Sequence, residues 1–231
     1  MKRVICSFSG GKTSAYMAIC LKEKYPDLVV IFANTGKERK ETLDFVNKVD
    51  KEYKLGVIWL EAVVYHGQRR GSGYKVVDYK TASKEGQPFE EVIKKYGIPN
   101  VSYLHCTREL KTNPITLYAK DNFQDNYVMA IGIRSDEIDR IPENYEEKKL
   151  FYPLADWGIK KLDINKFWSE QSFNLELQEH QGNCDFCYKK SFKKLKMLVS
   201  ENPELLKWWQ DMEVKYGSVP IEGKKAYNDD I

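Results

Sequence analysis

Short, continuous apolar runs alternate along the chain with segments whose apolar residues recur at helical spacing. The runs cover residues 4–8, 28–32, 57–60 and 127–131, and runs of this length are typical of strands buried on both faces. Helical spacing covers residues 15–24 and 42–53, and in the second segment Leu43, Val46 and Val49 share one side. The order strand, helix, strand, helix, strand predicts an α/β fold with a doubly wound, mostly parallel sheet and right-handed connections.

Beyond residue 60 the pattern predicts a long loop and then shorter elements. Residues 65–88 are rich in glycine and basic side chains, which predicts a mobile loop with a short hairpin over 74–79. Helices are expected over 89–96, 115–120, 163–171 with Asp163 as N-cap, 188–200 and 203–216, and a short strand over 150–154. We therefore expect a Rossmann-like, nucleotide-binding α/β domain over residues 1–160 and a helical C-terminal extension over residues 161–231.

A loop rich in glycine and hydroxyl groups joins the first strand to the first helix. Gly10 and Gly11 reach backbone angles closed to other residues, so the loop amides can turn inward. The helix that follows points its positive end at the same spot. Hydroxyl groups and one ammonium group complete the loop, from Ser7, Ser9, Lys12, Thr13 and Ser14. The loop predicts a cradle for phosphate or pyrophosphate, although its spacing is not that of a Walker loop, and an ordinary strand-to-helix turn is the alternative.

Composition narrows the class of protein. The 231 residues are 42% hydrophobic and 31% charged, which predicts a globular protein. The net charge of +3 neither predicts nor excludes nucleic-acid binding, which depends on local patches of charge. No apolar run reaches the length of a membrane span and no signal-peptide pattern opens the chain, so we expect a cytoplasmic protein without membrane contact. Five cysteines in such a chain favour metal ligands or catalytic groups over a disulfide framework.

Several motifs in order resemble the superfamily of N-type ATP pyrophosphatases, whose nucleotide loop is called the PP-loop. Residues 7–14 are similar to the PP-loop itself. Similarity to the phosphoadenosine phosphosulfate (PAPS) reductase branch lies in residues 33–36 with Glu38 and Thr42, in residues 106–111, and in residues 132–134 with Glu137 and Arg140. The chain also resembles reductase-like proteins carried by bacteriophages. This resemblance implies the fold of the adenine nucleotide alpha hydrolases.

The resemblance also implies where ATP or a PAPS-like adenine nucleotide binds. Its phosphates, with Mg²⁺, are expected against Ser7, Ser9, Gly10, Gly11, Lys12, Thr13 and Ser14, and its adenine against the backbone of Phe32, Ala33 and Asn34. Gly132 is expected at the nucleotide site, where Arg134 and Arg140 would contact phosphate or a sulfate-like group, as would Arg108 and Lys111 from the other wall. The alternative for Arg134 and Arg140 is pairing with the acidic residues 136, 137 and 139.

The C-terminal part departs from the reductases, which use a Glu-Cys-Gly motif that this chain lacks. Cys184 and Cys187 stand in its place, preceded by His180, and the Cys-x-x-Cys spacing lets two thiolates converge on one metal. Cys106 is the expected third ligand because its motif belongs to the same sheet edge, and His180 or His105 is the fourth unless that position stays open. A [4Fe-4S] cluster, a Zn²⁺ ion and a free thiol pair, in which Cys184 attacks and Cys187 resolves, remain alternatives.

The expected function is an enzyme that adenylates an acceptor with ATP and transfers sulfur. Cys106, Cys184 and Cys187 would hold the sulfur, and Lys12 would act on the phosphates. A PAPS or APS reductase and a nucleotide-binding module with a structural zinc are the alternatives. The expected partners are a nucleic acid or small-molecule acceptor, a sulfur or electron donor protein, and a second copy in a homodimer. Residues 69–70 and the lysines of 189–196 form a nucleic-acid surface in one interpretation and a solvated face in the other.

Overall fold

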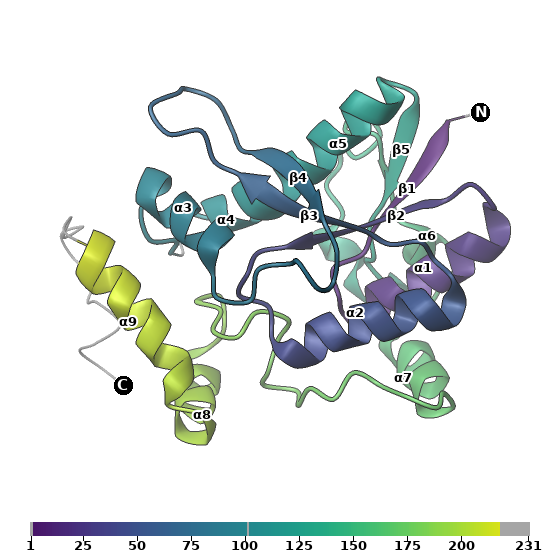
Figure 1. The fold of residues 1–231 in the computed structure, drawn as a ribbon. Coiled ribbons are helices and arrows are strands. Elements are labelled where there is room, and N and C mark those ends of the chain that lie inside the picture. Colours follow the sequence, from purple (N-terminus) through teal and green to yellow (C-terminus); the bar gives the residue numbers. More distant parts are fainter. Residues whose placement is uncertain (1, 101, 218–231) are drawn as a thin grey trace.

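A computed structural model of the chain describes residues 2–100 and 102–217, and six of its strands form one sheet (Figure 1). The strand order is β4-β3-β2-β1-β5-β6. All neighbours run parallel except β4, which is antiparallel to β3. The strands are β1 (Arg3–Ser7), β2 (Val29–Asn34), β3 (Ile58–Val63), β4 (Gly73–Val77), β5 (Tyr127–Ala130) and β6 (Leu150–Phe151). The predicted α/β fold with a mostly parallel sheet is therefore confirmed.

Helices connect the strands and extend the chain past them. The connections hold α1 (Lys12–Lys24), α2 (Lys40–Tyr53), α3 (Gln87–Tyr96), α4 (His105–Thr107), the π-helical turn η1 (Arg108–Thr112), α5 (Asn113–Phe123) and the 3₁₀ turn η2 (Ser135–Arg140). The chain continues through α6 (Pro153–Asp156), α7 (Lys161–Ser169), α8 (Phe192–Glu201) and α9 (Glu204–Tyr216). Among the residues that the structure describes, no helix has both the length and the apolar character needed to cross a membrane.

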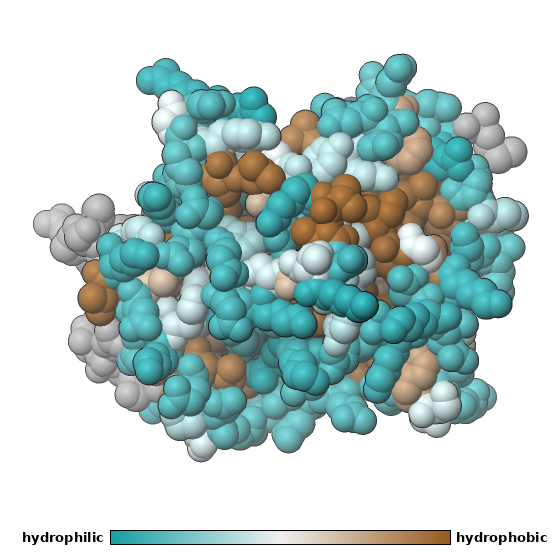
Figure 2. Space-filling view, in the orientation of Figure 1, coloured by the Kyte–Doolittle hydropathy of each residue, from teal (hydrophilic) through white to brown (hydrophobic). Residues whose placement is uncertain are grey.

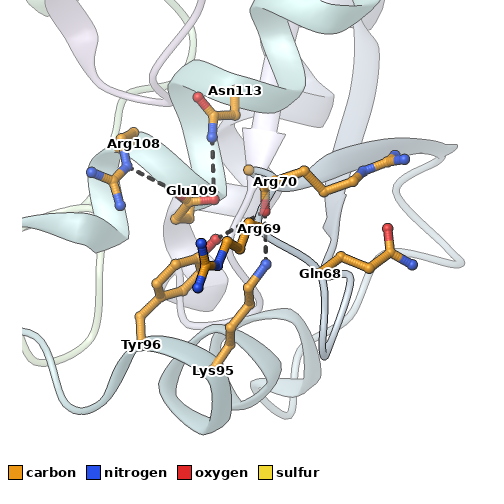
Figure 3. Close-up of a pocket in the computed structure, with 9 residues that line it drawn as sticks. Gln68, Arg69, Arg70, Lys95, Tyr96, Arg108, Glu109 and Asn113 are labelled. Carbon is orange, nitrogen blue, oxygen red and sulfur yellow. Dashed lines mark hydrogen bonds and ion pairs between the residues drawn. The ribbon is translucent and has the colours of Figure 1, made fainter.

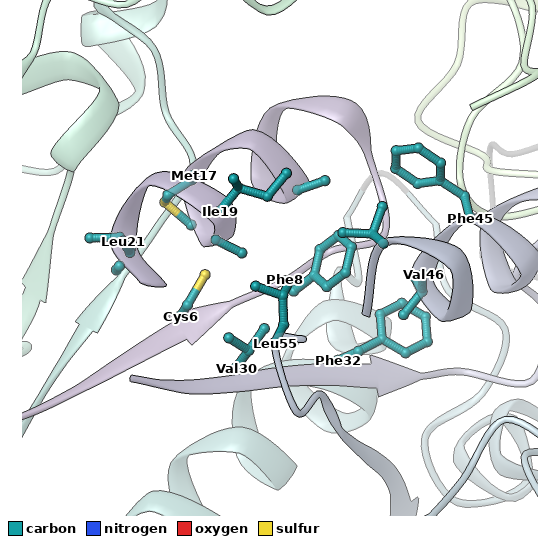
Figure 4. Packing of buried hydrophobic residues seen from close by; sticks show 14 of the residues in the cluster. Cys6, Phe8, Met17, Ile19, Leu21, Val30, Phe32, Phe45, Val46 and Leu55 are labelled. Atoms are coloured by element: carbon teal, nitrogen blue, oxygen red, sulfur yellow. The ribbon is translucent and has the colours of Figure 1, made fainter. Parts of the chain in front are cut away.

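Successive side chains along the central strands point to opposite faces of the sheet, so the apolar core lies in two layers, one on each face. Cys6 and Phe8 point to the face covered by α1 and α2, whereas Ile5 points to the face that α5 covers. Figure 4 shows Phe8 and Phe32 filling the space between the strands and these two helices. Burying each such side chain contributes about 1.5–3 kcal/mol, so this packing fixes the sheet on which the loops at its edge are built.

The C-terminal helices pack beside α3, away from the centre of the sheet (Figure 1). Phe89 of α3 contacts Trp209 of α9 with ring centroids 5.1 Å apart, and Phe186 belongs to the same apolar cluster. By contrast, α7 packs on the central core, where Trp168 meets Phe45 at 4.9 Å. The extension predicted from residue 161 thus contacts the sheet domain on two sides, and its residues 218–231 lie outside the described part.

Three local predictions need correction or refinement. The loop predicted over 65–88 contains β4, which pairs antiparallel with β3 and brings Val63 opposite Gly73. Asp163 is not the N-cap of its helix: Lys160 is, and the Asp163 carboxylate accepts the Lys160 backbone N–H at 2.8 Å. The helix expected from residue 188 begins at Phe192, because Ser191 takes an extended conformation as its N-cap.

Hydrophobic and hydrophilic residues occupy different parts of one face of the molecule. In Figure 2, hydrophobic residues gather over the sheet, whereas the loop between β3 and β4, at the upper left, is covered by hydrophilic residues. Figure 1 places that loop on the side of the molecule where α3 and α4 lie. Doubly wound α/β folds bind their ligands at the carboxyl ends of their parallel strands. The loops that follow β1, β2, β3 and β5 therefore lie where a functional site is expected.

Candidate functional site

The loop between β1 and α1 has the backbone conformation predicted for a phosphate cradle. Gly10 has a φ of +83°, which side-chain-bearing residues rarely adopt. A Cβ atom at this position would lie 2.6 Å from Cγ2 of Thr42, so glycine is required by space as well as by conformation. Gly10 therefore turns the chain tightly from the end of β1 into the first turn of α1.

Two serine hydroxyls organise the loop from inside. The Ser14 hydroxyl donates to the Gly11 carbonyl at 3.0 Å and accepts the Ser9 backbone N–H at 3.1 Å. The hydroxyl oxygens of Ser9 and Ser14 are 2.9 Å apart. In the described part of the chain no side chain caps the N-terminus of α1, so its first backbone N–H groups have no such partner. A phosphate fits this arrangement, since it accepts hydrogen bonds and is favoured at the positive end of a helix.

The remaining residues of the predicted loop frame this cradle. Ser7, at the end of β1, pairs with Ile31 in the sheet, and Thr13 and Lys12 are half-buried in the first turn of α1. Burial lowers the pKa of Lys12 below its usual value. The Lys12 carbonyl accepts the indole N–H of Trp168 at 3.0 Å, which ties α7 to the start of α1.

The end of β5 approaches the cradle at the point where the strand order reverses. A Cβ on Gly132 would lie 3.4 Å from Cα of Ser14, so this glycine permits a close approach of the two segments. Arg134 follows, and its Nη1 is 3.5 Å from the Thr13 hydroxyl. Arg134 also pairs with Asp136 at 2.8 Å and with Glu137 at 3.0 Å. Its guanidinium is thus held beside the cradle by two carboxylates.

Arg140, the second predicted phosphate ligand of this segment, is more exposed than Arg134 and pairs with Glu137 at 2.5 Å. The acidic pairing that was the alternative for both arginines is therefore what the structure contains. Because Asp136 and Glu137 face arginines, they are already neutralised by protein cations. Phosphate contact by Arg134 and Arg140 stays a prediction.

The end of β2 is buried, which restricts how an adenine can meet it. Phe32 and Asn34 are fully buried and Ala33 nearly so. Asn34 Nδ2 donates to Glu61 Oε1 and to the Ser83 carbonyl, both at 2.8 Å, and Phe32 packs in the core. The side chains at this strand end hold the neighbouring loops, so the predicted contact with adenine is left to the backbone, as the resemblance implied.

A segment from the C-terminal part of the chain lies across the cradle. Asn183 Nδ2 donates to the Ser9 carbonyl at 2.6 Å. The backbone on either side pairs with the segment after β2: Arg39 N–H donates to the Asn183 carbonyl at 2.8 Å, and Cys184 lies opposite Glu38. We call residues 181–187 the cover segment. It brings Cys184 to the edge of the sheet that holds the phosphate cradle.

Cys184 stands beside a partly buried ion pair. Its Sγ lies 3.9 Å from Glu38 Oε1, and the same oxygen pairs with Lys111 Nζ at 3.1 Å. The other Glu38 oxygen accepts the Thr35 backbone N–H at 2.8 Å. Burial raises the pKa of Cys184 to about 12, against the opposing effect of Lys111. Burial alone would lower the pKa of Lys111, but Glu38 and Cys184 hold it above its usual value.

The predicted metal ligands do not form a ligand set in the described part of the chain. Cys106 Sγ faces the Tyr188 hydroxyl at 3.6 Å, and His180 Nε2 is 2.8 Å from Glu201 Oε2. His105 bonds the Gly97 carbonyl at 2.9 Å. Within residues 2–100 and 102–217, no three histidine, cysteine, aspartate or glutamate side chains are placed to hold a metal ion. As the side chains lie, these residues do not fit an iron–sulfur cluster or a zinc ion.

Arg108 and Lys111, predicted to act from one wall, point to different places. Lys111 pairs with the Glu38 oxygen that Cys184 approaches, whereas Arg108 donates to Glu109 at 2.7 Å and lines a separate groove with Tyr96. Cys6 is buried in the core and burial raises its pKa, as expected of a packing residue.

Sequence reasoning missed Asn183, which contacts the cradle, and assigned no role to Glu38. Asn183 directly precedes Cys184, and Glu38 itself belongs to the motif that is similar to the reductase branch. These positions are the signals that the sequence offered for them.

Comparison with known proteins gives one family. The family model described as the phosphoadenosine phosphosulfate reductase domain matches residues 3–172. A protein of Escherichia phage lambda named "Uncharacterized nin region protein ORF290" is 35% identical over 209 residues, which cover 87% of this chain and 71% of the phage protein.

Two further relatives and one solved structure are more distant. Two proteins of Methanocaldococcus jannaschii, both named as uncharacterized, are 26% and 28% identical over 93% and 91% of this chain, and the chain spans only 42% and 47% of their lengths. The crystal structure of PAPS reductase from Candida auris, in complex with phosphate, is 19% identical with a TM-score of 0.48. The match covers 74% of this chain and 73% of that one.

Proposed function

Because the chain belongs to the phosphoadenosine phosphosulfate reductase domain family, we propose that it is an enzyme of adenine-nucleotide-dependent sulfur chemistry. The nucleotide's phosphates lie in the loop around Gly10, between the serine hydroxyls and the start of α1. Mg²⁺ arrives with the phosphates and neutralises part of their charge when bound. The adenine meets the backbone at the end of β2.

The observation that carries this proposal is the contact between the phosphate cradle and the cover segment. Asn183 bonds the loop at Ser9, and the next residue, Cys184, holds its thiol beside Lys111. A sulfur group on Cys184 therefore lies on the segment that covers the phosphates. The Lys111 ammonium stabilises negative charge on that sulfur, which a nucleophilic sulfur must carry.

In the leading reaction the nucleotide is ATP and the protein activates an acceptor. An acceptor oxygen attacks the α-phosphorus, the bond between the α- and β-phosphates breaks, and pyrophosphate leaves. Lys12 and the loop amides offset the charge that develops on the phosphates. A donor protein supplies Cys184 with a persulfide, whose outer sulfur attacks the adenylated acceptor and displaces AMP. Cys187 then attacks Cys184 Sγ, which releases the thiolated acceptor and leaves a Cys184–Cys187 disulfide for an external dithiol to reduce.

The description of the family favours a second reaction, reduction of a sulfonucleotide such as PAPS. The Cys184 thiolate attacks the sulfate sulfur, and the nucleotide leaves with the former bridging oxygen. Cys187 then attacks Cys184 Sγ, which releases sulfite and forms the same disulfide. In this reaction the dithiol supplies both electrons, and no ATP is split.

The two reactions are separated by their products. Pyrophosphate from ATP in the presence of acceptor supports the first reaction, and sulfite from PAPS with a dithiol supports the second. Ser14→Ala should weaken binding of either nucleotide about tenfold, because it removes the hydroxyl that orders the loop, whereas Ser200→Ala on the exposed side of α8 should not.

Cys184→Ser should abolish turnover and leave nucleotide binding intact, and Cys20→Ser on α1 serves as its control. Retained turnover in Cys184→Ser would contradict both reactions. Binding of neither nucleotide to the parent protein would contradict the proposal as a whole.

The metal centre of Cys106, Cys184 and Cys187 stays a prediction from the sequence. Iron, zinc and acid-labile sulfide are measured per chain after purification without oxygen. Iron and sulfide in equal amounts, lost in Cys106→Ser, would establish a cluster and require these side chains to turn away from their present partners. Protein without metal would leave the thiol pair as the sulfur-handling group.

A further inference from the structure

A groove with basic side chains and a tyrosine wall lies between the loop after β3, the end of α3 and η1 (Figure 3). It encloses about 520 Å³, and none of its lining residues belongs to the phosphate cradle. Its cations are Arg69, Arg70, Lys95 and Arg108, and we call it the Arg69 groove. We propose that the Arg69 groove binds the phosphodiester backbone of a single-stranded nucleic acid.

Positive charge in the groove is largely uncompensated. Among the residues that the structure describes, Arg69, Arg70 and Lys95 have no carboxylate within ion-pair distance. Lys95 donates to the backbone carbonyl of Arg70 at 2.7 Å, so its charge is not neutralised. Glu109 is the one acidic residue among those that line the groove in the described part of the chain, and only Arg108 pairs with it. The residues that line the groove thus include four cations and one carboxylate, and this excess of positive charge favours a polyanion.

Glu109 builds the groove rather than closing it. Its buried carboxylate accepts the Ser72 backbone N–H at 2.8 Å, the Ser72 hydroxyl at 2.9 Å and Asn113 Nδ2 at 3.1 Å. A Cβ on Gly71 would lie 2.5 Å from Asn113 Nδ2, so the loop is drawn against α5 as tightly as glycine permits. The arginines before Gly71 therefore project from an anchored loop, and less ordering is needed when a ligand binds.

Tyrosine rings support the guanidinium groups. Arg70 lies 3.5 Å from the centroid of the Tyr65 ring, and Arg108 lies 5.9 Å from that of Tyr96. In Figure 3, Arg69 and Arg108 extend to the side of the groove where Tyr96 lies, whereas Arg70 points away from it. Planar guanidinium groups bond phosphate oxygens in pairs, and aromatic and guanidinium planes accept stacked bases.

The openness of these side chains favours a strand over a small phosphate. Arg69, Arg70 and Arg108 are exposed, and they lie along the loop and on η1 instead of converging on one point. A strand that tracks such a surface places successive phosphates on successive cations and its bases on the rings. A mononucleotide would make only one of these interactions.

The groove shares one helical turn with the thiol site. Arg108 and Lys111 both belong to η1: Arg108 lines the groove, and Lys111 pairs at 3.1 Å with the Glu38 oxygen that lies 3.9 Å from Cys184 Sγ. If the proposed sulfur chemistry holds, a strand in the groove lies next to that chemistry as its acceptor. The role of the strand as acceptor rests on the proposed function, whereas binding in the groove does not.

Fluorescence polarisation of a labelled oligothymidylate tests the proposal. Arg69→Ala/Arg108→Ala should bind the strand about tenfold or more weakly. Because each arginine neutralises one phosphate, the double variant should also flatten the slope of log K against log salt by about 1.4. Lys148→Ala/Lys166→Ala removes the same charge from exposed positions outside the groove and should leave the affinity within about twofold. An equal weakening in both double variants would overturn the proposal, because binding would then follow net charge alone.

Competition and a cradle variant separate the remaining outcomes. Thymidine monophosphate and inorganic phosphate should displace the strand only at far higher concentration, and equally effective displacement would overturn a strand site in favour of a single-phosphate site. Arg69→Lys/Arg108→Lys should bind with intermediate affinity, since it keeps charge and loses the planar groups. Ser14→Ala should bind the strand normally while losing ATP affinity, so failure of the nucleotide cradle and failure of the groove give different results.

Discussion

Replacing Gly10 by alanine tests the backbone conformation at the head of the phosphate cradle. An alanine at the observed φ of +83° costs about 1–2 kcal/mol. Its Cβ would also lie 2.6 Å from Thr42 Cγ2, with Phe32 and Val46 atoms at 3.1 and 3.3 Å, and overpacking of this kind costs about 1–3 kcal/mol. The free energy of unfolding should therefore fall by about 2–5 kcal/mol, which is about 4–20 °C in Tm for a chain of this size.

A matched glycine isolates the two contributions. Gly56 has a φ of +67° and open space where a Cβ would be, so Gly56→Ala should cost only the conformational part, about 1–2 kcal/mol. Thr42→Ser removes the clashing methyl group and keeps the hydroxyl. Urea unfolding should show Gly10→Ala/Thr42→Ser to be more stable than the sum of the single changes by about 1 kcal/mol. Strict additivity, or a Gly10→Ala no worse than Gly56→Ala, would refute the steric argument.

Three other predictions follow from single side chains. Glu38→Gln removes a carboxylate that raises the pKa of Cys184, so iodoacetamide should label Cys184 faster in mildly alkaline buffer. Peptide mass spectrometry measures the labelling rate, and an unchanged or slower rate would contradict the effect of Glu38 on the thiol. Burial lowers the pKa of His105, so between the folded and unfolded pKa values the unfolded chain binds a proton that the folded chain does not, and stability should fall as pH drops through about 6.5 toward the folded pKa. The urea midpoint should fall less over that range in His105→Asn than in the parent protein, and parallel curves would contradict this role of His105. Trp168→Phe leaves the Lys12 carbonyl without its indole donor and should lower the free energy of unfolding by about 1–3 kcal/mol. Trp157→Phe, at a half-buried site, should lower it by less, and an equal loss in both variants would show that the hydrogen bond of Trp168 to Lys12 contributes little.

The strands and the cradle could be predicted from the sequence because their causes are local. A buried parallel strand needs a continuous apolar run, and residues 28–32 supply one. A tight turn from strand to helix needs glycine, and Gly10 occupies the position with positive φ. The edge strand β4 was foreseen only as a short hairpin, since its five residues do not alternate between buried and exposed and so carry little periodic signal.

The arrangement of the thiol site could not be predicted from the sequence, because it depends on contacts between segments that are far apart in the chain. Asn183 lies 174 residues from its partner Ser9, and Glu38 meets Cys184 across 146 residues. Arg108 and Lys111 both belong to η1, yet Arg108 lines the groove and Lys111 pairs with Glu38. Their predicted contact with phosphate from one wall stays a prediction.

The sequence by itself therefore determined the strands, the mostly parallel character of their sheet and the glycine loop that can receive phosphate, since each follows from the preferences of neighbouring residues. Only the tertiary structure decided that the cover segment crosses that loop, that Lys111 and Glu38 surround the Cys184 thiol, and that the exposed arginines form a groove. These features arise where separate elements pack together, and the packing of a whole core is not written in any one stretch of the chain.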